Sequence, residues 1–251
     1  NTAYKAARTY LNALGRKDIS VKIHIEKKIP TQAGMGGGSA DAAAVLNALA
    51  DIFPDAVSRD DLMTIAAGIG ADVPFCMEGG TQLCEGIGEI LKPSEPLKGL
   101  PILFIKPRCS ISTPWAFGEF DRLGAKTSAP DRLAEELSDR MAGTRAGTDT
   151  RAAEALDRLL KAPAGSEPLE RLLNAAPWLE NDLESIAESR YPELADVRNW
   201  LDAHGAAFSR MSGSGSTLFG VFKNGDARDA ALAEAKAVFG DTYFVESGAT
   251  L

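Results

Sequence analysis

A loop rich in glycine, placed directly before an alanine-rich apolar run, most constrains how this chain can fold. The stretch reads GMGGGSADAAAVLNAL over residues 34–49. Its glycines permit backbone conformations with positive φ and let another group approach the main chain closely. The apolar spacing that follows predicts a helix over about 39–50. Such a helix presents unpaired N–H groups and the positive end of its dipole to the loop.

The segment before the loop is expected to be a strand. Val21, Ile23 and Ile25 alternate there with polar residues, which is the pattern of a strand with one buried face. A strand, a glycine loop and a helix start in this order form an anion-binding site, and phosphate is its usual ligand. The simpler alternative is a tight turn with Ser39 as the helix N-cap. That alternative leaves most of the glycines unexplained, because a plain turn needs only one or two.

Two common phosphate loops do not fit this stretch. A Walker A loop requires a lysine after its glycines, and residues 34–41 contain none. A dinucleotide-binding loop requires a third glycine where this chain has Ser39. The acidic residues at about the right distance for a ribose, Asp60 and Asp61, are expected at a helix start and not at a strand end.

The rest of the chain alternates helical and strand patterns. Further helices are expected at 2–14, 60–67 (capped by an aspartate and ended by Gly68), 182–189, 192–204 and 227–238. Strands are expected at 101–107, 217–222 and 242–247, with a loop and one or two short strands within 68–91 and a glycine-rich turn at 212–216. This mixture indicates an α+β fold in two lobes that divide near 92–100.

Composition excludes several classes of function. A formal net charge of −8 argues against a nucleic-acid partner or an anionic membrane surface bound through overall charge. Cys76, Cys84 and Cys109 are odd in number and lack CxxC spacing, which is typical of reduced thiols in a cytoplasmic protein. No apolar run approaches the ~20 residues of a membrane helix. Two histidines are too few and too separated for a histidine-based metal site.

Three motifs in order resemble those of one kinase superfamily. PTQAGMGGGSA (30–40) is similar to the phosphate loop of the galactokinase, homoserine kinase, mevalonate kinase and phosphomevalonate kinase (GHMP kinase) superfamily. GIGADVPF (68–75) resembles its catalytic-aspartate segment, and MSGSGSTLFG (211–220) resembles its third motif. Together with SISTPWAF and NDLE…YPEL, these motifs most resemble the 4-diphosphocytidyl-2-C-methyl-D-erythritol kinases. The resemblance covers nearly all of the chain outside 121–177.

The resemblance implies a two-lobed GHMP kinase fold. An ATP-binding first lobe like ribosomal S5 domain 2, truncated here, is expected over 1–95. A ferredoxin-like C-terminal lobe with a helical insertion at about 121–177 is expected over 96–251. The implied reaction uses ATP and Mg²⁺ to phosphorylate the 2-hydroxyl of 4-diphosphocytidyl-2-C-methyl-D-erythritol in non-mevalonate isoprenoid biosynthesis. The alternatives are another GHMP small-molecule kinase and a non-catalytic nucleotide-binding module. We expect a cytoplasmic monomer or weak homodimer with no nucleic-acid or membrane partner.

The same resemblance implies roles for individual residues. Asp72 would contact the substrate and accept the proton of its hydroxyl, although its position fits a cap or turn aspartate equally well. Contacts with ATP are expected from Asn1, Lys27, Pro30, Thr31, Gln32, Ala33, Gly34, Met35, Gly36, Gly37, Gly38, Ser39 and Ala40.

Substrate contacts are expected beyond the phosphate loop. Phe117 would stack on the cytosine ring, although an aromatic residue there is commonly part of a core, and Thr113 would be a polar contact. Asn181 and Asp182 match a family pair for which the sequence offers no mechanism. A helix N-cap explains Asp182 equally well.

Members of the family begin with a segment whose first motif carries a lysine that supports the transferred phosphate. Residues 1–251 contain no such motif, and they begin with Asn1 and not with methionine. We therefore expect that the sequence lacks its natural beginning. The alternative is a short form that holds nucleotide without turnover.

Overall fold

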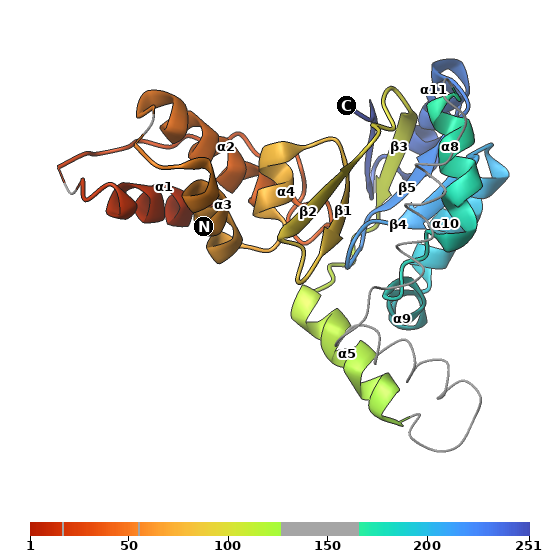
Figure 1. Cartoon of the computed structure of the whole chain (residues 1–251). Helices are drawn as coiled ribbons and strands as arrows, with labels where there is room; N and C mark the ends of the chain where they lie inside the picture. The colour runs from red at the N-terminus through yellow and green to blue at the C-terminus, as the bar shows by residue number, and fades with distance from the viewer. Residues whose placement is uncertain (17, 55, 127–165) are drawn as a thin grey trace. The chain divides into compact units, whose positions relative to one another are not determined.

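The computed structural model describes residues 1–16, 18–54, 56–126 and 166–251 (Figure 1). Contacts group the chain into two compact units. Unit 1 contains residues 1–31 and 36–94, and unit 2 contains residues 32–35 and 95–251. Most of the expected insertion at 121–177 lies outside the described residues. Among those that are described, no helix combines the length and apolar character needed to cross a membrane.

Unit 1 is mostly helical. Its elements are α1 (Thr2–Ala13), α2 (Gly37–Ile52), α3 (Arg59–Ile69), α4 (Val73–Glu78) and the antiparallel hairpin β1 (Thr81–Glu85) with β2 (Ile90–Ser94). Small residues let α1 and α2 pack closely: Ala6 and Tyr10 share one buried cluster with Ala42 and Leu46. The cluster packs α1 against α2, whose first turn follows the glycine loop.

The strand expected before the glycine loop is not formed. Residues 20–29 have no regular secondary structure, and the side chain of Val21 is 42% exposed. The alternation still sets the side-chain orientation, because Ile23 and Ile25 are half-buried while their polar neighbours are exposed. A strand also needs hydrogen bonds from a partner strand, and no strand of the described residues pairs with this segment. The prediction of a strand was therefore wrong for the chain as described.

Two further expectations in unit 1 are corrected. The N-cap of α3 is Ser58, whose Oγ accepts a hydrogen bond from the N–H of Asp61 at 3.1 Å, so the cap is not an aspartate. Gly68 lies inside α3, and Gly70 ends it. Beyond it, part of the segment predicted as loop forms α4. Pro74 in the first turn of α4 lacks the N–H that a helix start cannot pair in any case.

Unit 2 is built on a four-stranded antiparallel sheet in the order β4-β5-β3-β6 (Figure 1). The strands are β3 (Pro101–Lys106), β4 (Phe208–Met211), β5 (Leu218–Val221) and β6 (Phe244–Ala249). The helices are α5 (Thr113–Lys126), α8 (Pro168–Ala175), α9 (Glu184–Arg190), α10 (Glu193–Ala203) and α11 (Gly225–Phe239), with a short 3₁₀ turn η1 (Ala176–Trp178). The predicted edge strand near the end of the chain is confirmed as β6.

Both faces of this sheet are covered, which explains the unbroken apolar run of β3. Leu103 and Ile105 face a core shared with α10 and α11. Ile102 faces the opposite side, in a second core that includes Leu172 of α8. A strand buried on both faces shows no polar alternation. The sheet therefore gives a rigid base for the loops at the ends of β3 and β4.

Candidate functional site

The glycine loop leads directly into the first turn of α2. This helix begins at Gly37, and Gly36 is its N-cap in the left-handed conformation, with φ of +63° and no side-chain cap bond. Ser39 is therefore the third helical residue, and the reading of Ser39 as an N-cap was wrong. The first N–H groups of a helix lack intrahelical partners. The start of α2 thus offers main-chain donors without a competing side-chain cap.

A cation and a hydroxyl lie against the same helix start. Lys27 Nζ donates a hydrogen bond to the carbonyl oxygen of Gly37 at 3.2 Å and forms an ion pair with Asp41. Thr2 Oγ1 donates to the carbonyl oxygen of Gly38 at 2.7 Å. Asn1 caps α1, because its Oδ1 accepts a hydrogen bond from the N–H of Tyr4 at 3.2 Å. Within unit 1, the ammonium group of Lys27, paired with Asp41, therefore lies at the helix start where the sequence predicts an anion.

The middle of the loop is hydrogen-bonded to the glycine-rich turn between β4 and β5 and packs closely against it. Residues 32–35 belong to unit 2, where Ser212 Oγ donates to the carbonyl oxygen of Gly34 at 2.9 Å. The N–H of Thr217 donates to the carbonyl oxygen of Ala33 at 3.1 Å. A Cβ atom on Gly34 would lie 2.1 Å from the carbonyl oxygen of Ser212, and the φ of Gly34 is +71°. Only glycine permits this approach of two main chains.

Asn181 holds the glycine-rich turn from the other side. Its Nδ2 donates to the carbonyl oxygens of Met211 and Gly213, each at 2.8 Å. Its Oδ1 accepts a hydrogen bond from the N–H of Leu183 at 3.0 Å. The sequence offered no mechanism for Asn181, because the two carbonyl groups that its Nδ2 binds lie 30 and 32 residues further along the chain. Asp182 is exposed and is not the N-cap of α9, a position held by Leu183, so the cap reading was wrong.

Replacing Asn181 with alanine should destabilise unit 2 by about 2–3 kcal/mol, because three hydrogen bonds disappear and two carbonyl groups lose a donor. The midpoint of urea denaturation measures this effect. Asp182→Ala is the matched control and should change stability by less than about 0.5 kcal/mol, since Asp182 is exposed. Equal midpoints for the two variants would contradict the assigned role of Asn181.

The glycine-rich turn also contacts the start of α5. The hydroxyl groups of Thr113 and Ser214 are hydrogen-bonded at 2.8 Å. Phe117 lies four residues further along α5, hence on the same helix face, and its side chain is 53% exposed. The reading of Phe117 as a core residue was therefore wrong. Trp115, by contrast, packs against the core of unit 2, with its ring 6.2 Å from that of Tyr191.

Asp72 stands at the start of α4 in unit 1. It occupies the N-cap position, but its side chain makes no cap hydrogen bond. Its side chain is exposed, and no cation of the described residues lies within ion-pair distance of its carboxylate. Burial raises the pKa of Cys76 and of Cys84, and the negative charge of Asp72 adds to both shifts. The carboxylate of Asp72 is therefore accessible to a ligand. A capping aspartate would instead use its carboxylate to accept a hydrogen bond from the start of α4, which Asp72 does not do.

Models of known protein families match this chain in two segments. The sequence matches the GHMP kinases N terminal domain over residues 1–80 and the GHMP kinases C terminal domain over residues 150–241. A curated relative from Synechococcus sp. (strain JA-3-3Ab), named 4-diphosphocytidyl-2-C-methyl-D-erythritol kinase, is 38% identical over 88% of this chain and 64% of its own length. One of the same name from Nitratidesulfovibrio vulgaris (strain DP4) is 34% identical over 94% of this chain and 73% of its own length. The chain thus spans about two thirds of these relatives.

Solved structures show the same fold. A crystal structure of 4-(cytidine 5'-diphospho)-2C-methyl-D-erythritol kinase superposes with a TM-score of 0.68 at 31% identity, covering 100% of this chain and 77% of that one. The mevalonate kinase of L. major also gives a TM-score of 0.68, at 16% identity over 99% of this chain and 76% of that one. The second likeness supports the fold alone.

Proposed function

We infer the function from membership, because this chain belongs to the GHMP kinases and, within them, to the family of 4-diphosphocytidyl-2-C-methyl-D-erythritol kinases. We propose that it transfers the γ-phosphoryl group of ATP to the 2-hydroxyl of that cytidine substrate, in non-mevalonate isoprenoid precursor biosynthesis. The observation that carries the proposal is the junction in unit 2. There, one glycine-rich turn contacts Gly34 of the phosphate loop and Thr113 of the helix that bears Phe117.

The phosphates of ATP would be bound mainly by main-chain groups. The first N–H groups of α2, from Gly37 onward, point out of the helix start and carry its positive dipole end. Lys27 places its ammonium group beside Gly37. Its ion pair with Asp41 holds the ammonium group at the loop. An ammonium group at the loop is also what a Walker A lysine supplies in other nucleotide-binding proteins.

Asp72 would accept the proton of the substrate hydroxyl. The hydroxyl oxygen bonds to the γ-phosphorus, the bond from that phosphorus to the β,γ-bridging oxygen breaks, and ADP leaves with the bond electrons. The proton passes to the carboxylate, which must be accessible to the substrate. The exposed side chain of Asp72, without a capping bond, meets this requirement.

Mg²⁺ would enter with the phosphates of ATP and neutralise part of their charge. Magnesium sites in such enzymes take one or two carboxylates and several phosphate and water oxygens. No group of three or more metal-binding side chains is gathered in the residues that the structure describes. The described residues therefore fit an ion that ATP brings in better than an ion that the protein holds alone.

The exposed aromatic ring on α5 favours a cytidine substrate over mevalonate or homoserine, which have no ring to stack. Replacing Phe117 with alanine should weaken binding of cytidine diphosphate about tenfold, because stacking of a base on an aromatic side chain contributes about 1–3 kcal/mol. Titration calorimetry measures this change. Phe117→Tyr, which keeps the ring, should retain the affinity. An alanine variant that binds cytidine diphosphate as tightly as the parent would remove the basis for the choice of substrate.

Two accompanying proposals concern the setting of the protein. We propose that it acts in the cytoplasm, since Cys76, Cys84 and Cys109 are all free thiols in the structure. We also propose that it works as a monomer or weak homodimer. A non-catalytic nucleotide-binding module would show ATP-dependent thermal stabilisation without any product, which separates it from the kinase.

A further inference from the structure

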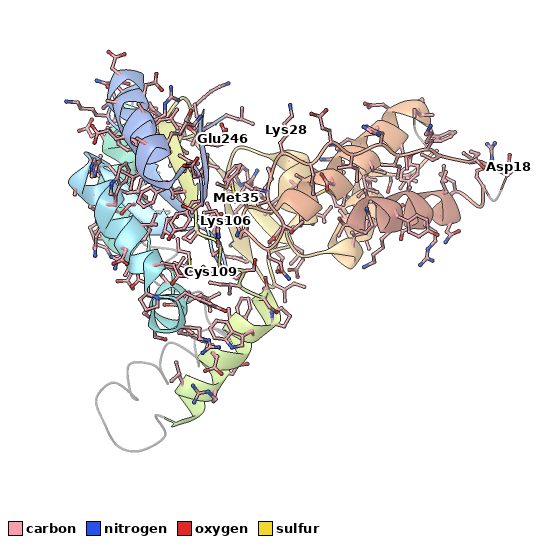
Figure 2. The ribbon with its side chains drawn as sticks, turned by 180° about the vertical axis from the view of Figure 1, so that it is seen from behind. Asp18, Lys28, Met35, Lys106, Cys109 and Glu246 are labelled. Carbon is pink, nitrogen blue, oxygen red and sulfur yellow. The ribbon has the colours of Figure 1, made fainter. Side chains whose placement is uncertain are left out.

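A buried lysine lies beside the substrate segment and has no part in the chemistry described so far. Lys106 is the last residue of β3, and its side chain is only 7% exposed. Its Nζ donates hydrogen bonds to the carbonyl oxygens of Pro107 at 3.1 Å and Cys109 at 3.0 Å. Figure 2 shows Lys106 and Cys109 near each other in unit 2.

The ammonium group of Lys106 is held by carbonyl dipoles and not by a counter-ion. No carboxylate of the described residues lies within ion-pair distance of Lys106. Burial lowers the pKa of Lys106. Burial also raises the pKa of Cys109 to about 11, so this thiol is uncharged at neutral pH. A buried cation without a counter-ion is costly, and an apolar side chain would fill the space at lower cost. A role in packing alone does not explain a lysine here.

The carbonyl group of Cys109 is the point where two segments meet. Ser216, whose side chain is fully buried, donates from Oγ to the same carbonyl oxygen at 2.6 Å. The segment 107–113 is thus attached to the glycine-rich turn at Cys109, and again at Thr113 through the hydroxyl of Ser214. All of these residues lie in unit 2.

We propose that Lys106 is a positioning residue for the cytidine end of the substrate. By fixing the carbonyl groups of Pro107 and Cys109, it sets where α5 begins, and therefore where Thr113 and Phe117 stand relative to the glycine-rich turn. The residue acts through these two side chains and has no contact with the transferred phosphate. This inference rests on the proposed function, because it names the same cytidine-binding segment.

The test compares Lys106→Met with Lys223→Met, an exposed lysine that follows β5. We expect Lys106→Met to raise the KM for 4-diphosphocytidyl-2-C-methyl-D-erythritol and the Kd for cytidine diphosphate about tenfold, the cost of about one hydrogen bond to a charged group. The kcat and the KM for ATP should stay within about twofold, since neither depends on where Phe117 stands. Lys223→Met should change none of these quantities.

Ser216→Ala is a second test of the same contact, and it tests the positioning role even if Lys106→Met fails to fold. It should raise the same two constants by several-fold. In the double variant, the loss of binding free energy for cytidine diphosphate should exceed the sum of the losses in the two single variants. The carbonyl group of Cys109 is then left without either donor.

The outcomes separate this inference from the proposed function. A parent protein that neither binds cytidine diphosphate nor phosphorylates the cytidine substrate overturns both. A parent that does so, with Lys106→Met and Ser216→Ala binding cytidine diphosphate as tightly, overturns only the positioning role. A fall in kcat with unchanged KM would also overturn it, since that pattern places Lys106 at the chemical step.

Discussion

Replacing Asp72 with asparagine should lower kcat about a thousandfold, because the substrate hydroxyl then loses the group that accepts its proton. Asparagine keeps the size of the side chain but cannot take up a proton. The side chain of Asp72 is exposed and makes no cap hydrogen bond, so the free energy of unfolding should change by less than about 0.5 kcal/mol. Steady-state kinetics at saturating ATP and substrate measure the effect.

The control for this variant is Asp60→Asn, an exposed aspartate in the first turn of α3. It changes the net charge by the same amount and should leave kcat unchanged. The Kd for ATP should be similar in the parent and both variants, because the phosphates are assigned to the start of α2. Normal turnover by Asp72→Asn would rule out Asp72 as the acceptor of the proton.

Replacing Gly34 with alanine should destabilise the fold by about 3 kcal/mol or more and abolish stabilisation by ATP. The new Cβ would lie 2.1 Å from the carbonyl oxygen of Ser212 and 2.8 Å from the main-chain nitrogen of Gly215. Both contacts are with backbone atoms, which cannot move aside as a flexible side chain can. The positive φ of +71° adds about 1–2 kcal/mol of local strain. Urea denaturation and melting curves with and without ATP measure the two effects.

Gly36→Ala is the matched control from the same loop. Gly36 has a nearly equal φ of +63°, but among the described residues no atom beyond its chain neighbours lies within 4 Å of the position that its Cβ would occupy. Only the backbone strain applies, so the loss should be about 1–2 kcal/mol. If both alanine variants lost the same stability, the strain of the loop would be the cause, and the contact between the two main chains would not matter.

The elements recognised from the sequence are those with a strong local pattern of apolar residues. Helices such as α2 and α10 follow from apolar spacing, and β3 from an apolar run between prolines. The segment at 20–29 failed because a strand depends on a partner that a period-2 pattern does not reveal. The predicted cap of α3 was wrong because Ser58 and Asp60 lie two residues apart and both residue types cap helices, so only the geometry selects Ser58.

The candidate site shows the same division. The phosphate loop is recognisable as a run of glycines, because its function needs a backbone conformation that glycine permits. The roles of Asn181 and Lys106 are not visible, because each acts on carbonyl groups, and a carbonyl group is present at every residue. Which carbonyl a side chain reaches is decided by the packing of the sheet and its loops. Such contacts appear only once the chain is folded.

The central claim is tested most directly by following ATP consumption in the presence of 4-diphosphocytidyl-2-C-methyl-D-erythritol. The protein should be expressed from its complete reading frame, with mevalonate and homoserine as parallel substrates. The account predicts ADP and a singly phosphorylated cytidine product in equal amounts, with phosphate on the 2-hydroxyl, and no product from the other two alcohols. Binding of ATP without any phosphorylated product, or phosphorylation of mevalonate or homoserine instead, would contradict it.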